Sequence, residues 1–365
     1  MRTFDFRDGL RRRTLMRMTS LLRASVIAAL VLGVGCSGAH LQSLSDAGAE
    51  GPDAAPVVRS CHLGSPPPAP AFAGEGCYCD GPFAVRGGVA YRQSYMLEVI
   101  DVSTAGAPHL VTSLPSHAFY ASDVGIVGDV LVSAGGALEL FDLRAPLAPV
   151  SLGTVDVGGE VHAMAVSNGR IVVSITRADQ SNALVVLDAS DPRAVRVGAA
   201  LELGALGVGS LAMRGTVAFG AAMDLTGTTP SRVVAIETAD VSTPRMLGSL
   251  VAPVTYLATV GLHDTRLFVS GLETGVRVVD VADPAAMRDL GVAIEGVPGA
   301  MAVAVTNDVL VVAGQGLSLY DLSTPTLTPM GRTEPTADSP HAMIVGNQLL
   351  GSGGNALFSI PLACD

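Results

Sequence analysis

The chain has 365 residues, of which 49% are hydrophobic, 42 are glycine and 22 are proline, and its formal net charge is −11. This length and composition suit one large all-β domain of short strands and tight turns rather than long helices. The 22 basic residues are all arginine, and seven of them precede residue 36, so the rest of the chain is strongly acidic. That charge excludes nucleic acid and anionic lipid surfaces as partners.

Residues 1–35 have the features of an export signal. A basic stretch precedes a short apolar run, Val26 to Val34, which is too short to span a bilayer. The segment LGVGC resembles the lipobox of bacterial lipoproteins, whose cysteine is lipidated and becomes the first mature residue, although Gly33 stands where that motif usually has leucine. We therefore expect lipidation of Cys36 and anchoring in the cell envelope, at the outer membrane or cell surface. Plain secretion and an uncleaved anchor are the alternatives.

Residues 36–76 are predicted to be a flexible tether, because they are small, polar and without periodicity and end in a proline-rich stretch. Disulfides are the expected state of the four remaining cysteines, since their number is even and the protein is exported. These are Cys61, Cys77, Cys79 and Cys364. Cys77 and Cys79 are too close in sequence to pair easily, so we expect one to bond Cys61 and the other Cys364. Free buried thiols or a metal site are the alternatives.

A repeated phrase organises residues 77–365. Short runs rich in valine, leucine and isoleucine end mostly in an acid, at steps of 41, 46, 49, 43, 41 and 40 residues. The runs are LEVID, LELFD, LVVLD, VVAIE, VRVVD, LSLYD and LFSIP, which end at Asp101, Asp142, Asp188, Glu237, Asp280, Asp321 and Pro361. A regular period of this size indicates a repeat architecture.

Each period contains four short strands bounded by turn residues, as in VHAMAVSN, IVVSIT, ALVVLD and VRVGAALEL of the third unit. Four-stranded antiparallel units bury both faces when they stack radially, which predicts an all-β fold, a β-propeller of seven blades, with six or eight blades as alternatives. The last unit has three strands before the chain ends. We expect residues 57–62 to supply its outer strand and so to close the ring.

The acids at the strand ends are interpreted as structural. A carboxylate in this position accepts hydrogen bonds from backbone amides of the following turn, and the proline a few residues later fixes the exit of that turn. Six copies spread around a ring cannot all serve one site. The acids are Asp101, Asp142, Asp188, Glu237, Asp280 and Asp321.

With strand, acid, Ser or Thr and proline recurring together, the segments LEVIDVSTAGAP, LVVLDASDP, VRVVDVADP and LSLYDLSTP resemble the LVIVD repeat of bacterial and archaeal exported proteins. The resemblance covers roughly residues 82–361, and VVAIETADVSTP departs from it by using Glu237 and a longer turn. It implies a propeller at the cell surface or in the envelope. It carries no catalytic residue set that transfers to this chain.

No common catalytic or phosphate-binding motif occurs in the sequence, and the lack of tryptophan leaves few rings on which sugars would stack. We therefore expect a monomeric binding scaffold without a cofactor, which contacts an envelope protein or other surface partner and meets the membrane through its lipid anchor alone. The alternative is a metal-dependent hydrolase or lactonase. Asp123, His162 and His341, with His117 nearby, would then hold a divalent metal at the channel mouth. Otherwise these side chains hydrogen-bond the backbone there.

Overall fold

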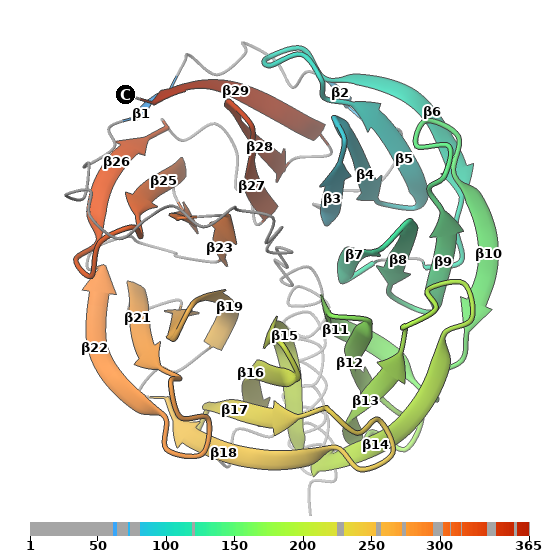
Figure 1. Cartoon of the computed structure of the whole chain (residues 1–365), viewed down its shortest axis with the longest axis vertical. Coiled ribbons are helices and arrows are strands. Elements are labelled where there is room, and N and C mark those ends of the chain that lie inside the picture. Colours follow the sequence, from blue (N-terminus) through green and yellow to red (C-terminus); the bar gives the residue numbers. More distant parts are fainter. Residues whose placement is uncertain are drawn as a thin grey trace, which may run out of the picture. The chain divides into compact units, whose positions relative to one another are not determined.

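A computed structural model of the chain describes residues 61–63, 72–73, 81–118, 121–224, 230–252, 257–271, 275–294, 302–306, 308–314, 316–333, 341–353 and 356–364. These residues form seven antiparallel sheets arranged around one axis, a seven-bladed β-propeller (Figure 1). The prediction of seven four-stranded blades is confirmed. No helix among the described residues has the length and apolarity needed to cross a membrane. The predicted signal and residues 36–60 of the tether lie outside these ranges.

The first six blades each follow chain order from the innermost strand to the outermost. Blade 1 consists of β3 (Phe83–Arg86), β4 (Val89–Gln93), β5 (Met96–Asp101) and β6 (His109–Pro115). Blade 2 consists of β7 (Asp123–Val127), β8 (Val130–Ala134), β9 (Leu138–Asp142) and β10 (Val150–Val155). Blade 3 consists of β11 (Glu160–Ser167), β12 (Arg170–Thr176), β13 (Asn182–Asp188) and β14 (Arg196–Gly204).

The next three blades repeat this order. Blade 4 consists of β15 (Leu206–Arg214), β16 (Val217–Asp224), β17 (Arg232–Glu237) and β18 (Arg245–Val251). Blade 5 consists of β19 (Leu257–His263), β20 (Arg266–Gly271), β21 (Gly275–Asp280) and β22 (Arg288–Ile294). Blade 6 consists of β23 (Ala302–Thr306), β24 (Val309–Gly314), β25 (Gly316–Asp321) and β26 (Thr328–Arg332).

Blade 7 joins the two ends of the described chain. Its inner strands are β27 (His341–Val345), β28 (Gln348–Gly353) and β29 (Ala356–Cys364), and its outer strand is β1 (Cys61–Leu63). The short strand β2 (Phe72–Ala73) pairs with the other end of β29. An N-terminal segment therefore completes the last blade, as the sequence predicted. Of the expected residues 57–62, Cys61 and His62 lie in this strand and the others fall outside the described ranges.

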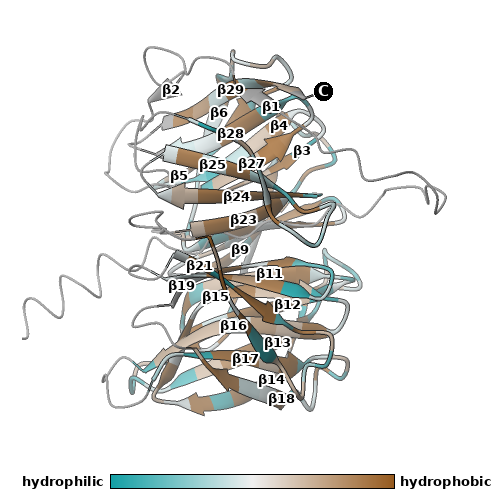
Figure 2. Ribbon diagram, turned by 90° about the vertical axis from the view of Figure 1, so that its left-hand side faces the viewer, coloured by the Kyte–Doolittle hydropathy of each residue, from teal (hydrophilic) through white to brown (hydrophobic). Residues whose placement is uncertain are grey.

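Burial follows the position of each strand in its blade, and many residues of the strands are hydrophobic (Figure 2). The third strand β13 is buried along nearly its whole length, whereas the outermost strand β10 is exposed along nearly all of it. Strands whose two faces both pack against neighbouring blades read as continuous apolar runs, which is why LVVLD and its relatives lack alternation. The core therefore lies between blades. One apolar cluster joins Leu138 and Leu140 of blade 2 to Val173 and Val185 of blade 3.

A β-bulge recurs in the outermost strand of the first six blades. In blade 2, for example, Ser151 and Gly153 pair with consecutive residues of β9, which leaves Leu152 as the extra residue. Bulges increase strand twist and disfavour pairing of an exposed edge with another strand. The rim of the ring is therefore shaped to present side chains rather than a flat strand edge.

Candidate functional site at the inner strands

Asp123 and His341 occupy the same position in their blades, four residues before the end of the innermost strand. In blade 3 that position belongs to Ala163, because the register shifts between Val161 and Ala163 and leaves His162 as the extra residue of a bulge. The three residues predicted to share one level of the channel mouth are therefore not equivalent. Asp123 and His341 also belong to blades 2 and 7, which blade 1 separates.

The Asp123 side chain is buried against the next blade. Its Oδ1 accepts a hydrogen bond from the amide of Val124 at 2.8 Å, and its Oδ2 accepts one from the amide of Met164 at 3.1 Å. Burial raises the pKa of this carboxyl well above its usual range, although both hydrogen bonds act in the opposite direction. The arrangement favours a protonated structural carboxyl that joins blades 2 and 3.

Small hydroxyl side chains make the same connection farther round the ring. Ser210 Oγ accepts a hydrogen bond from the amide of Val260 at 3.1 Å, and Thr259 Oγ1 accepts one from Val303 at 2.7 Å. Ser210 and Thr259 also lie four residues before the end of their innermost strands. In these three blades the polar side chain at this position therefore accepts a hydrogen bond from the innermost strand of the next blade.

The histidines have separate surroundings. His341 is buried, with 4% of its surface exposed, and His162 is half-buried in a setting where desolvation lowers its pKa and so favours the neutral ring. The exposed ring of His117 has Nδ1 at 3.2 Å from Glu139 Oε1. Within the described ranges, no group of three or more His, Cys, Asp or Glu side chains is placed to hold a metal ion.

Glu139 is a buried polar centre that sequence reasoning did not identify. It is fully buried on β9 and accepts hydrogen bonds from Ser116 Oγ at 2.8 Å, the His117 amide at 2.6 Å and Ser151 Oγ at 3.0 Å. Burial raises the pKa of Glu139, but the hydrogen bonds from His117, Ser116 and Ser151 together hold it below its usual value. The signal in the sequence was an acid inside the apolar run LELFD.

The acids at the ends of the third strands cap the turns that follow. In all six described copies the carboxylate accepts a hydrogen bond from the backbone amide two residues later, at 2.8 to 3.1 Å. The pairs are Asp101 with Ser103, Asp142 with Arg144, Asp188 with Ser190, Glu237 with Ala239, Asp280 with Ala282, and Asp321 with Ser323. The same hydrogen bond recurs in all six copies, which indicates that these acids stabilise the turns.

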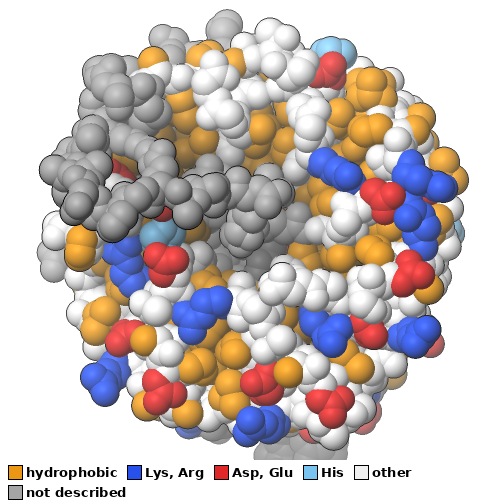
Figure 3. Space-filling model, in the orientation of Figure 1, with side chains coloured by type: hydrophobic (Ala, Val, Ile, Leu, Met, Phe, Trp, Pro, Cys, Tyr) orange, Lys and Arg blue, Asp and Glu red, His pale blue; other side chains and the backbone are white. Residues whose placement is uncertain are grey.

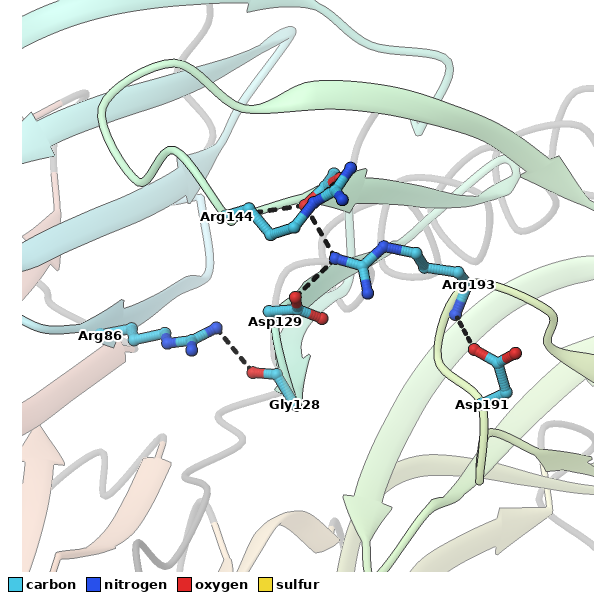
Figure 4. A network of polar contacts seen from close by, with 7 residues as sticks. Arg86, Gly128, Asp129, Arg144, Asp191 and Arg193 are labelled. Carbon is cyan, nitrogen blue, oxygen red and sulfur yellow. Dashed lines mark hydrogen bonds and ion pairs between the residues drawn. The ribbon is translucent and has the colours of Figure 1, made fainter.

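Arginine side chains connect neighbouring blades near these turns and at the inner hairpins (Figure 4). Arg193 of blade 3 contacts Asp129 at 2.5 Å and Asp142 at 3.1 Å in blade 2, and Arg86 of blade 1 donates to the carbonyl of Gly128 at 2.7 Å. The hydrogen bond from Arg193 lowers the pKa of Asp129, and hydrogen bonds from Arg144, with a smaller one from Arg193, lower the pKa of Asp142.

Further round the ring, other side chains of the inner hairpins bond carbonyl oxygens of the next blade. Arg214 donates to Val281 at 2.8 Å, Arg266 donates to Leu322 at 2.7 Å, and Gln348 donates to Val102. Arginine and acidic side chains are interspersed over the face shown in Figure 3. These four arginines therefore act within the ring, a role that composition did not reveal.

Strand pairing places Cys61 directly opposite Cys364. From the sequence we expected instead that one of Cys77 and Cys79 bonds Cys61 and the other bonds Cys364. Cys77 and Cys79 lie outside the described residues, as does the predicted lipidation site Cys36.

No family model and no curated protein matches the chain. Solved structures do match, at TM-scores between 0.54 and 0.57 and at 12% to 16% sequence identity. The putative 6-phosphogluconolactonase of Bacteroides fragilis is 12% identical, with 77% of this chain and 98% of that chain covered and a TM-score of 0.57. The Neurospora crassa Pan2 WD40 domain is 12% identical, with 77% and 88% covered and a TM-score of 0.55. The computationally designed Ika8 protein is 12% identical, with 80% and 99% covered and a TM-score of 0.54. Likeness at this level of identity shows the propeller fold alone.

Proposed function

We propose that this chain is an exported propeller of the LVIVD-repeat type, lipidated at Cys36, which binds a protein partner in the cell envelope. The observation that carries the binding role is the apolar rim, defined here as the exposed apolar side chains of the outermost strands. Its members are Val111 of β6, Val150 and Leu152 of β10, Val197 of β14, Met246 and Val251 of β18, and Leu290 and Val292 of β22.

Exposure in the apolar rim is high for large apolar side chains, reaching 63% at Val150 and 60% at Leu290. Two such residues occur together on each of β10, β18 and β22, and they are carried by bulged edge strands. Large apolar side chains exposed on an edge strand offer surface that a bound protein would bury. The acidic, tryptophan-free chain favours a protein over a nucleic acid or a glycan.

The described polar groups of the inner strands support a scaffold rather than a reaction centre. Asp123, Ser210 and Thr259 are each engaged by backbone amides of the next blade. Their chemistry is thus used to join blades, and the outer surface is left for recognition.

Crosslinking in the native envelope tests the binding role. A Val150→Glu, Leu290→Glu variant places two charges on the apolar rim, and we expect it to lose the crosslinked species that the wild-type chain forms. Thr154→Glu is the matched control, because Thr154 is exposed on the same strand as Val150 and its replacement adds charge without removing a large apolar group. Equal crosslinking by the double variant and the wild type, with the fold retained, would reject the role of the apolar rim.

Fractionation tests the anchor separately. We expect the wild-type chain in the membrane fraction and a Cys36→Ser variant outside it. A Cys36→Ser variant that stays with the membrane, or a wild-type Cys36 peptide without lipid in mass spectrometry, would contradict lipidation.

The alternative function is a metal-dependent hydrolase or lactonase at the channel mouth, involving Asp123, His162 and His341. It draws on the fold likeness to two Bacteroides propellers described as putative 6-phosphogluconolactonases. Elemental analysis of protein purified without a histidine tag separates the two functions. About one divalent metal per chain, lost in a His162→Ala, His341→Ala variant, would favour the hydrolase, whereas folded, monomeric, metal-free protein would favour the scaffold.

A further inference from the structure

The first and last described strands of the chain meet in blade 7. Strand β1 runs antiparallel to the end of β29, with Cys61 opposite Cys364, His62 opposite Ala363 and Leu63 opposite Leu362. The pairing thus brings together two cysteines that are separated by nearly the whole propeller sequence.

This register brings the two α-carbons within the separation that a disulfide spans. Residues directly opposite each other in an antiparallel pair have α-carbons about 4.5 or 5.5 Å apart, depending on the type of pair. Disulfides join α-carbons about 4.4 to 6.8 Å apart. Both types of pair fall inside that range, so the backbone positions of Cys61 and Cys364 meet the requirement in either case.

The fold also gives a disulfide here a purpose. Strand β1 has three residues, and it completes the outer edge of the blade that closes the ring. Leu63 packs, partly buried, against the apolar cluster that contains Met330 and Leu362, which fixes one end of the strand. A short strand at the edge of a sheet opens more easily than the core strands unless it is tied down. A bond at Cys61 would fix the other end.

We propose that Cys61 and Cys364 form a disulfide that locks the propeller ring closed. The reaction is an exchange with a disulfide oxidant, either a thiol-disulfide oxidoreductase or a small-molecule disulfide. One cysteine thiolate attacks the oxidant and releases one of its sulfurs as a thiol. The second thiolate then displaces the other sulfur, so the two cysteines lose two protons and two electrons and the oxidant becomes two thiols. Formation in the cell rests on the proposed export, because disulfides persist in oxidising compartments.

Peptide mapping of the full chain under non-reducing conditions tests the bond. Trypsin together with a glutamate-specific protease separates Cys61, in residues 60–75, from Cys77 and Cys79, in residues 76–86. Cys364 lies in residues 333–365. We expect a linked species of peptides 60–75 and 333–365 in protein isolated from its native envelope. A link between 76–86 and 333–365, or a free thiol at Cys364 after oxidation, would overturn the proposal.

A second arm separates the pairing from the export on which it rests. The reduced full chain is reoxidised with glutathione disulfide and mapped in the same way. The 60–75 link to 333–365 in this sample, together with free thiols in the native sample, would retain the pairing and reject export to an oxidising compartment. Absence of the link from both samples would reject the pairing.

Thermal unfolding provides the energetic test. Because the bond closes a loop that contains nearly the whole propeller, we expect Cys61→Ser or Cys364→Ser to lower the Tm by about 10 °C, and the double variant to be no worse than either single variant. A Cys77→Ser, Cys79→Ser variant is the matched control and should keep both the link and the Tm. Equal Tm values for the wild type and Cys364→Ser would contradict a locking role.

Discussion

The carboxyl group of Asp123 accepts a hydrogen bond from the backbone amide of Met164, which lies on the innermost strand of the next blade. The amide of Val124 occupies its other oxygen. Both amides are buried, so they need this acceptor once water has been excluded. Asp123 thus performs in blade 2 the function that Ser210 and Thr259 perform farther round the ring.

Replacement of Asp123 should therefore be costly. We expect Asp123→Ala to lower the free energy of unfolding by about 2 kcal/mol, because it leaves two buried amides without an acceptor. Asp123→Asn keeps one acceptor oxygen but sets an NH2 donor against the other buried amide, so it should restore only about half of that loss. Denaturant unfolding at a pH near 5 measures both variants. An alanine variant as stable as the wild type would show that the two amide contacts contribute nothing.

The raised pKa of Asp123 predicts a pH dependence with a definite sign. The folded carboxyl holds its proton to a higher pH than the unfolded one does, so the folded state binds more protons between the two pKa values. Stability contributed by Asp123 is thus full below about pH 4, the ordinary pKa of aspartate, and decreases as pH rises above it. We expect Asp123→Asn to gain stability relative to the wild type between pH 4 and pH 7, measured by denaturant unfolding at several pH values. A constant difference between the two proteins over that range would contradict the raised pKa.

The fold was predictable because its information is repeated. Seven copies of one apolar run at a steady interval indicated both strand order and blade number, and the missing last strand pointed to an N-terminal donor. Those inferences depend on periodicity and on the need to bury both faces of a sheet, which a single sequence contains. The pairing of β1 with β29 confirms that an N-terminal segment completes the last blade.

The site was less predictable because it depends on register. A bulge of one residue at His162 moves it out of line with Asp123 and His341, and nothing in the sequence VHAMAV marks where that bulge falls. The contacts that join blades, such as Arg193 to Asp129, link residues 64 positions apart and follow from the closed ring rather than from any local pattern. The pairing of Cys61 with Cys364 likewise follows from closure of the ring and not from a local sequence pattern.

The turn acids allow a simple test of their structural role. Asp321 is buried at the end of β25 and accepts the amide hydrogen of Ser323 at 2.8 Å. We expect Asp321→Ala to lower the free energy of unfolding by about 1 kcal/mol, the usual contribution of such a capping bond. Ser323→Ala is the control, since it removes an exposed hydroxyl and keeps the amide donor. If both variants unfold at the same denaturant concentration, the carboxylate does not stabilise the turn.

Close packing between blades predicts an effect of one added methyl group. Gly198 lies in the outermost strand of blade 3, beside the turn of blade 4, where the amide of Ala199 donates to the carbonyl of Val241 at 2.7 Å. A Cβ at Gly198 would come closer than 3.0 Å to the carbonyl oxygens of Val241 and Val186, so one backbone must move.

We expect Gly198→Ala to lower the free energy of unfolding by about 2 kcal/mol, in the range of other overpacking substitutions. Gly209→Ala is the matched control, because a Cβ there meets nothing within 4 Å and the loss of glycine freedom in the unfolded chain favours the folded state. The free energies of unfolding of the two variants, measured by thermal and denaturant unfolding, should therefore shift in opposite directions from the wild type or differ by at least the cost of the clash. Equal stability of the two variants would show that the backbone at Val241 and Val186 yields without cost, and would contradict close packing at Gly198.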